Sequence, residues 1–152
     1  MNNTCCFFGH RTINETDELR TKITEAAERL ITDENVDTFL FGSRSEFDRL
    51  CLDIVTQLKE KYPHIKRTYV RAEYPYIDDG YLTYLLRSYD DTYYPQKLHG
   101  AGRAVYVERN YEMIDNSKFC IIYYDKNIAR KSGTGIALNY AAKTCMEIIL
   151  VS

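Results

Sequence analysis

Short apolar runs occur along the whole chain, each bounded by small or polar residues. The runs at 4–8, 36–41, 67–72, 119–124 and 147–151 have the length and the near-continuous apolar character of buried strands. The first of them begins almost at the start of the chain. We therefore expect that run to form a central strand of the sheet.

Longer segments between these runs place their apolar residues on one face, with the spacing of amphipathic helices. Such segments lie at 19–31 and 47–58, and shorter helices are predicted at 81–86, 109–116 and 136–143. Alternating strands and helices of this length indicate βαβ units, whose right-handed crossovers place helices on both faces of the sheet. The sequence thus predicts an α/β fold with a Rossmann-like, mainly parallel sheet.

A Tyr-rich insert at about 73–102 interrupts this alternation. We interpret the insert as an elaborated loop or flap over the edge of the sheet, irregular over 88–95 and followed by a further strand at 104–107. No linker or internal repeat divides the 152 residues, and a chain of that length can bury one substantial core. We therefore expect a single domain over 1–152.

Tyrosine is abundant, with 14 residues in a chain that has no tryptophan. Tyrosine offers a large contact area at little entropic cost, so it suits both ligand stacking and subunit contacts. We expect some insert tyrosines to belong to the core and others to stack on a base or form an oligomer contact. The insert tyrosines are Tyr74, Tyr76, Tyr81, Tyr84, Tyr89, Tyr93 and Tyr94.

Charge and cysteine content narrow the classes of function. The formal net charge is −2, which argues against general nucleic-acid binding. No apolar run approaches a membrane span, and the polar start is not a signal peptide, so we expect a cytoplasmic protein. Without C-x-x-C pairs, the cysteines are expected to be reduced, buried thiols and not metal ligands. They are Cys5, Cys6, Cys51, Cys120 and Cys145.

Glycine, hydroxyl and arginine residues follow the predicted strands at Gly9–Arg11, Gly42–Glu46, Arg71, Glu73 and Ser132–Gly135. Ligands of open parallel sheets bind beyond the carboxyl ends of the strands. Glycine lets the backbone approach a ligand, arginine and hydroxyl groups donate to phosphate oxygens, and a helix N-terminus attracts anions. This edge of the sheet is therefore predicted to bind a phosphate or a nucleotide, although the last segment is also compatible with an ordinary glycine-bearing turn.

Two residues after the first strand have competing interpretations. His10 is either a ligand contact or a loop histidine hydrogen-bonded to the backbone. Arg11 is expected to face an anion, because a guanidinium group just past a buried strand is costly without one.

Three further candidates also have structural alternatives. Arg44 either contacts the ligand or pairs with an acidic neighbour, Glu46 or Asp48. Glu73 either accepts from ribose hydroxyls or a base amine, or pairs with Arg71. Arg109, with Asn110, either points to the same edge or is solvated.

The segment Cys6–Arg11 resembles the C-F-T-G-H-R opening of a YpsA-like branch of the SLOG superfamily, which includes the DNA-processing SMF/DprA proteins and the Lonely Guy enzymes. The similarity continues at 41–48, 69–75, 109–115 and 132–134, and so covers nearly the whole chain. The resemblance implies a Rossmann-like fold and a pocket for nucleotides or nucleotide-derived ligands.

The same resemblance bears on catalysis. Lonely Guy enzymes are phosphoribohydrolases whose loop reads P-G-G-x-G-T-x-x-E, with a catalytic glutamate. Aligning Gly133-Thr134 with that G-T places Ala137 at the glutamate position, and alanine supplies no carboxylate for acid–base chemistry. We therefore expect no catalytic residues of that type; Glu73 or Glu46 acting from another strand is the alternative.

Together these observations predict a standalone SLOG-like domain that binds a nucleotide or an ADP-ribose-derived ligand, cyclic forms included, without a further cofactor. We expect a sensor or a sequestering sponge, including a phage anti-defence role, in a bacterium or an infected bacterial host. The alternative is a nucleotide-processing enzyme, an N-glycosidase or a phosphohydrolase. The chain is expected to form a homo-oligomer. The predicted ligand-binding residues are Gly9, His10, Arg11, Gly42, Ser43, Arg44, Arg71, Glu73, Arg109, Asn110, Ser132, Gly133, Thr134 and Gly135.

Overall fold

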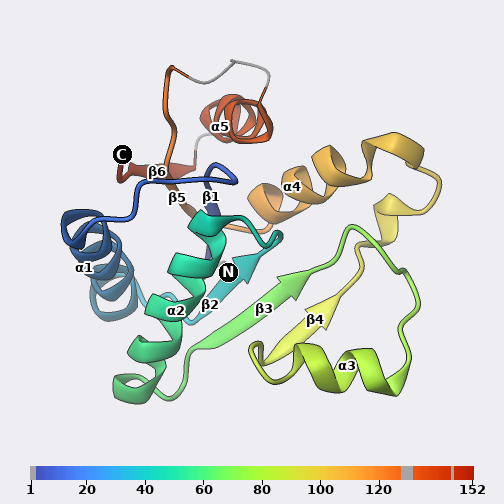
Figure 1. The fold of residues 1–152 in the computed structure, drawn as a ribbon, viewed down its shortest axis with the longest axis horizontal. Helices are drawn as coiled ribbons and strands as arrows, with labels where there is room; N and C mark the ends of the chain where they lie inside the picture. Colours follow the sequence, from blue (N-terminus) through green and yellow to red (C-terminus); the bar gives the residue numbers. More distant parts are fainter. Residues whose placement is uncertain (1–2, 128–131, 145) are drawn as a thin grey trace.

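The first strand of the chain lies inside a six-stranded sheet, as its early apolar run predicts. In the computed structural model, which describes residues 3–127, 132–144 and 146–152, β1 (Thr4–Phe8) pairs with β2 (Thr38–Phe41) and with β5 (Phe119–Ile122). The strand order is β4-β3-β2-β1-β5-β6, and every pairing is parallel (Figure 1). The predicted α/β class is thereby confirmed.

Helices and strands alternate along the chain. The other strands are β3 (Lys66–Val70), β4 (Asp91–Tyr93) and β6 (Glu147–Leu150). The α-helices are α1 (Asp17–Asp33), α2 (Glu46–Lys61), α3 (Asp79–Leu85), α4 (Val105–Asp115) and α5 (Gly133–Lys143), and the short 3-10 helices are η1 (Gln96–Leu98) and η2 (Gly102–Ala104).

The two faces of the sheet carry separate apolar clusters, because successive strand residues point to opposite sides. Cys5 and Phe7 of β1 pack in one cluster with α1, α2 and Leu85 of α3. Cys6 and Phe8 pack in the other with α4 and α5. Figure 1 shows α4 and α5 together on one side of the sheet. Helices therefore cover both faces, as predicted.

The insert at 73–102 is more regular than predicted. It contains α3, which corresponds to the short helix predicted at 81–86, and then β4, which was not predicted and which pairs with β3 from Thr68 to Val70 and so extends the sheet. The prediction of an irregular 88–95 segment is therefore wrong at 91–93, where β4 lies, and holds for the residues on either side. A three-residue edge strand that begins with Asp91 and Thr92 has no apolar run to reveal it.

The strand predicted at 104–107 is also wrong. Ala104 ends η2, and α4 begins at Val105. An apolar run of four residues does not distinguish a strand from the first turn of a helix. The helix predicted at 109–116 therefore begins four residues earlier than its pattern indicates.

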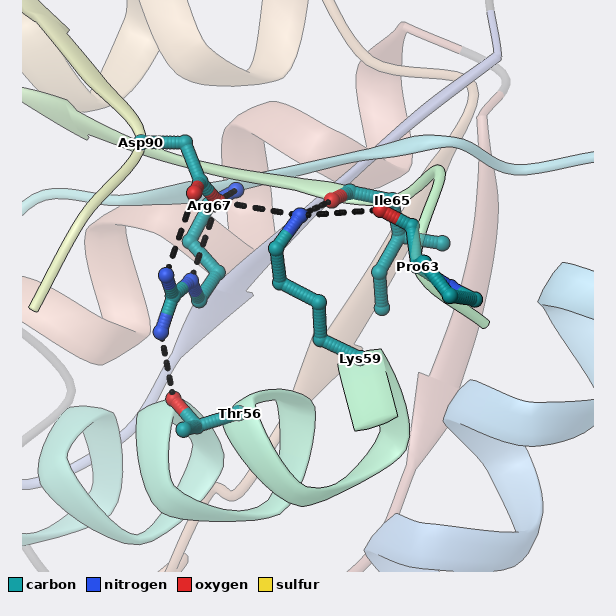
Figure 2. A network of polar contacts seen from close by, with 6 residues as sticks. All are labelled: Thr56, Lys59, Pro63, Ile65, Arg67 and Asp90. Carbon is teal, nitrogen blue, oxygen red and sulfur yellow. Dashed lines mark hydrogen bonds and ion pairs between the residues drawn. The ribbon is translucent and has the colours of Figure 1, made fainter. Parts of the chain in front are cut away.

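A polar network at the amino-terminal edge of the sheet ties β4 to β3 and to α2 (Figure 2). The Asp90 carboxylate accepts from the Arg67 backbone N–H at 2.8 Å and from its Nε at 3.0 Å. Lys59 Nζ lies 3.8 Å from the same carboxylate and donates to the carbonyl oxygens of Pro63 and Ile65. The network supports β4, and therefore the insert, from the edge opposite the loops that follow the strands.

Replacing Asp90 by asparagine is expected to weaken the fold in a pH-dependent way. Burial raises the pKa of Asp90, but the hydrogen bonds and charge of Arg67 outweigh burial and lower the pKa below its usual value. The resulting stabilisation is present above the unfolded-state pKa and lost as pH falls through the folded-state pKa. We expect Asp90→Asn to cost roughly 1–2 kcal/mol of unfolding free energy at neutral pH, a modest value because solvent screens the group.

Urea denaturation of both proteins at neutral pH and at pH 3 measures this effect. The gap between wild type and Asp90→Asn should shrink as pH falls below about 4. A gap of the same size at both pH values would contradict the assignment.

Candidate functional site

The strand order reverses direction between β1 and β5. The chain builds β2, β3 and β4 on one side of β1 and then returns to add β5 and β6 on the other. A crevice forms at such a switch point, beyond the carboxyl ends of the strands, because the connections on its two sides diverge. The loops that follow β1, β2 and β3 all end at this edge.

A cavity of about 510 Å³ occupies the switch point, and we call it the inner lobe. Its walls come from the segment after β1, the segment after β2, two residues of α4 and the beginning of α5. The polar and glycine residues that line it are Gly9, His10, Arg11, Thr12, Gly42, Ser43, Asp48, Arg109, Asn110, Ser132, Gly133 and Thr134.

A second cavity, of about 660 Å³, adjoins the inner lobe, and we call it the tyrosine lobe. It includes Arg44, Arg71 and Glu73, and its aromatic wall consists of Tyr69, Tyr74, Tyr81, Tyr84 and Tyr106. The residues common to both lobes are Arg11, Gly42, Ser43, Arg109, Asn110 and Gly133. The shared wall makes the two lobes one continuous site.

Arg109 stands in the wall between the lobes and is only 6% exposed. Its Nη1 donates to the carbonyl oxygens of Gly42 and, at 3.4 Å, of Val70, while its Nε donates to Asn110 Oδ1 at 2.9 Å. The guanidinium carbon lies 5.9 Å from the centre of the Tyr106 ring. Burial lowers the pKa of Arg109, yet an arginine side chain stays charged at neutral pH. A buried positive charge therefore faces the site.

The arginines of the two lobes form no close ion pairs in the part of the chain that the structure describes. Among the residues that the structure describes, none of Arg11, Arg44, Arg71 and Arg109 forms an ion pair with a carboxylate. The whole chain nevertheless has a net charge of −2. Four arginines and two acidic residues, Asp48 and Glu73, line the lobes, so the site has a local excess of positive charge, which attracts anions.

Asp48 is an acidic residue of the inner lobe and is 4% exposed. Its Oδ2 accepts from the backbone N–H of Ser43 at 2.9 Å and from the Ser43 hydroxyl at 2.8 Å. Burial raises the pKa of Asp48 to about 6, although the bonds from Ser43 and the charge of Arg109 oppose the shift. Asp48 therefore fixes the loop after β2 from within the core.

Comparison with known proteins gives a relative that covers most of the chain. No protein-family model matches it. The uncharacterized SPbeta prophage-derived protein YoqJ of Bacillus subtilis (strain 168) is 31% identical to it over 149 residues, which covers 84% of this chain and 82% of YoqJ. The chain belongs to the YoqJ family.

His10 of this YoqJ-family protein has the backbone-bonded role that was one of its two interpretations. Its Nε2 accepts the backbone N–H of Asp125 at 2.8 Å, so that nitrogen carries no proton. Burial lowers the pKa of His10, and the charge of Asp125 only partly opposes this. The ring still lines the inner lobe, as a neutral group.

Gly9 and Gly42 are required by packing. A Cβ atom at Gly9 would lie 2.2 Å from Cγ of Phe47, and one at Gly42 would lie 2.6 Å from Sδ of Met113. The prediction that these glycines admit a ligand is therefore incomplete, because the space at each Cα is filled by a core side chain.

The surroundings of the site arginines differ from those that the sequence predicts. Arg11 is exposed, so the expectation of a costly buried guanidinium applies instead to Arg109, which is not solvated. Arg44 Nη1 donates to the Tyr84 hydroxyl at 2.8 Å and pairs with neither acidic neighbour. Arg71 is buried and does not pair with Glu73.

Arg71 instead holds the loop that follows β3. It donates to the carbonyl oxygens of Tyr74 at 3.1 Å and Pro75 at 3.4 Å, and to Thr92 Oγ1 at 3.1 Å. Tyr74 has a φ of 59°, a left-handed conformation that is rare outside glycine. The bonds from Arg71 stabilise this conformation. Arg71 thus shapes the tyrosine lobe.

The beginning of α5 closes the inner lobe. Ser132 caps the helix by accepting the backbone N–H of Gly135 at 3.1 Å. Gly133 and Thr134 line the lobe, whereas Gly135 does not. Ala137 is fully buried in the cluster beneath α4 and α5, so the position expected for a Lonely Guy glutamate belongs to the core.

None of the described cysteines lines either lobe of this site. Cys5, Cys6, Cys51 and Cys120 are buried, and Cys145 lies outside the described residues. Within the described ranges, His, Cys, Asp and Glu side chains form no group of three or more that is arranged to hold a metal ion. Over the same ranges, no helix combines the length and apolar character needed to cross a membrane.

Proposed function

We propose that this YoqJ-family protein binds a nucleotide or an ADP-ribose-derived ligand, cyclic forms included, across the inner and tyrosine lobes. The proposal rests on the four arginines that line these lobes. In the part of the chain that the structure describes, none of them forms an ion pair with a carboxylate. Guanidinium groups bind phosphate through paired, charge-assisted hydrogen bonds, and tyrosine rings stack on bases. We assign the phosphate to the inner lobe, between Arg109 and the start of α5, and the base and ribose to the tyrosine lobe.

The biological role that we propose is that of a sensor or a sequestering sponge of the SLOG type. The resemblance of the loop segments to SLOG proteins supports this role, and the prophage-derived relative favours a phage anti-defence setting. Exposed side chains of the tyrosine lobe, such as Tyr74 and Tyr106, offer area for the homo-oligomer that the sequence predicts.

Thermal denaturation with AMP, ADP-ribose and cyclic ADP-ribose isomers tests the proposal. A ligand at about a hundred times its Kd stabilises the folded state by about 2.7 kcal/mol, which raises Tm by several degrees. Heating the complex and analysing the supernatant by chromatography should then recover the ligand intact. No change in Tm with any of these ligands would overturn the proposal.

A nucleotide-processing enzyme is the second candidate, and Asp48 is the observation that favours it. A carboxyl group with a pKa of about 6 in the inner lobe is suited to general acid–base catalysis. The burial of Ala137 speaks for binding without hydrolysis by the Lonely Guy mechanism. The same chromatography decides, because free base or ribose phosphate in the supernatant would demonstrate catalysis.

A further inference from the structure

A third cavity, of about 470 Å³, lies between α2 and α3, and we call it the arginine groove. It is lined by Arg44, Arg49 and Arg87 together with the hydroxyl-bearing Tyr84 and Ser88, and no acidic residue lines it. None of these three guanidinium groups forms an ion pair with a carboxylate in the part of the chain that the structure describes. The groove is therefore a second concentration of positive charge.

Arg44 and Tyr84 connect the arginine groove to the tyrosine lobe, because both residues line both cavities. The guanidinium carbon of Arg44 lies 5.2 Å from the centre of the Tyr84 ring, and Nη1 donates to the hydroxyl of that ring at 2.8 Å. Tyr84 is also stacked with Tyr81, with ring centres 6.0 Å apart. A pair of aromatic rings thus stands between two positively charged regions.

The tyrosine pair lies between the arginines of the main site and those of the arginine groove. A ligand that contacts all three regions is longer than a mononucleotide. The two lobes of the main site already have the volume of an ordinary small-molecule pocket, so a mononucleotide would leave the arginine groove unused. A nucleoside at the tyrosine pair would direct one flanking phosphate toward Arg109 and the other toward Arg49 and Arg87. Exposed guanidinium groups remain hydrated and cost the fold little, yet they bind phosphate oxygens well.

We propose that the arginine groove is a second phosphate subsite, and that the ligand class is a dinucleotide whose two phosphate groups flank a nucleoside. This inference rests on the proposed nucleotide function of the inner and tyrosine lobes. It extends the proposed ligand by at least one phosphate group beyond a mononucleotide.

Isothermal titration with AMP and with the 5′-phosphorylated dinucleotide pApA tests the subsite. Wild type should bind pApA on the order of tenfold more tightly than AMP. Arg87→Gln and Arg49→Gln should each remove most of that difference and leave AMP affinity unchanged. Arg103→Gln is the matched control, since Arg103 is exposed on η2, loses the same charge and lines none of the three cavities.

The other outcomes separate the inference from the proposed function. Equal affinities of wild type for AMP and pApA, or equal weakening of both by Arg87→Gln, would overturn the second subsite and leave the nucleotide site standing. Binding of neither AMP nor pApA, together with no effect of the ADP-ribose ligands on Tm, would overturn both. Much tighter binding of a single-stranded hexanucleotide than of pApA would replace the dinucleotide assignment by a nucleic-acid surface.

Discussion

Replacing Arg109 by glutamine is expected to abolish measurable nucleotide binding and to lower the free energy of unfolding by roughly 2–4 kcal/mol. The guanidinium group donates to the carbonyl oxygens of Gly42 and Val70, and its charge opposes the burial cost of Asp48. Glutamine is too short to replace these donors and brings no charge. Isothermal titration measures the loss of binding, and urea denaturation measures the loss of stability.

One further variant separates the charge of Arg109 from its geometry, and a second serves as a control. Arg109→Lys keeps the charge but not the planar pair of donors, so we expect intermediate stability and weak binding. Arg103→Gln, which removes an exposed arginine outside the site, should leave both quantities unchanged. A folded Arg109→Gln protein that binds nucleotides with wild-type affinity would show that Arg109 does not hold the ligand phosphate.

The sheet and its main helices were predictable because their signals are local. Buried strands such as β1 and β5 are continuous apolar runs, and α1 and α2 bury one face with helical spacing. β4 was missed because its pairing with β3 depends on Asp90 and Arg67, which are far apart in sequence. A strand stabilised by a distant ion pair leaves no periodic pattern of its own.

The convergence of the loops was predictable for a different reason. All strands are parallel, so every segment that follows a strand reaches the same edge. That argument places residues at an edge, but it does not say which of them is buried. Arg11 is exposed while Arg109 is enclosed, because Arg109 comes from a helix packed over the end of β2.

Asp48 was the main omission from the predicted site. In the sequence it is one of several charged residues in a surface helix, and only its position in the first turn of α2 sets it apart. Its burial arises from the loop after β2, whose Ser43 turns back to donate to its carboxylate. A hydrogen bond of this kind, between a loop and the first turn of the helix that follows it, is not encoded in helical periodicity.

Asp48 is expected to make the fold less stable as pH rises. Burial raises its pKa from 3.8 in the unfolded chain to about 6, so the folded state binds the proton more tightly. The unfolding free energy should therefore fall by about 3 kcal/mol in total as pH rises, mostly between pH 4 and pH 6, and become level above about pH 7. Asp48→Asn removes this dependence while its amide oxygen still accepts from Ser43.

Urea denaturation of wild type and Asp48→Asn from pH 4 to pH 7 isolates this contribution, because all other titrating groups are common to both. The variant should gain roughly 2.5 kcal/mol relative to wild type over that range. Asp90→Asn provides a control of opposite sign, whose gap from wild type changes only at lower pH. Parallel curves for wild type and Asp48→Asn would show that Asp48 does not titrate in this range.

A phosphate bound near Asp48 should favour its protonated form, so nucleotide affinity should rise as pH falls in wild type but not in Asp48→Asn.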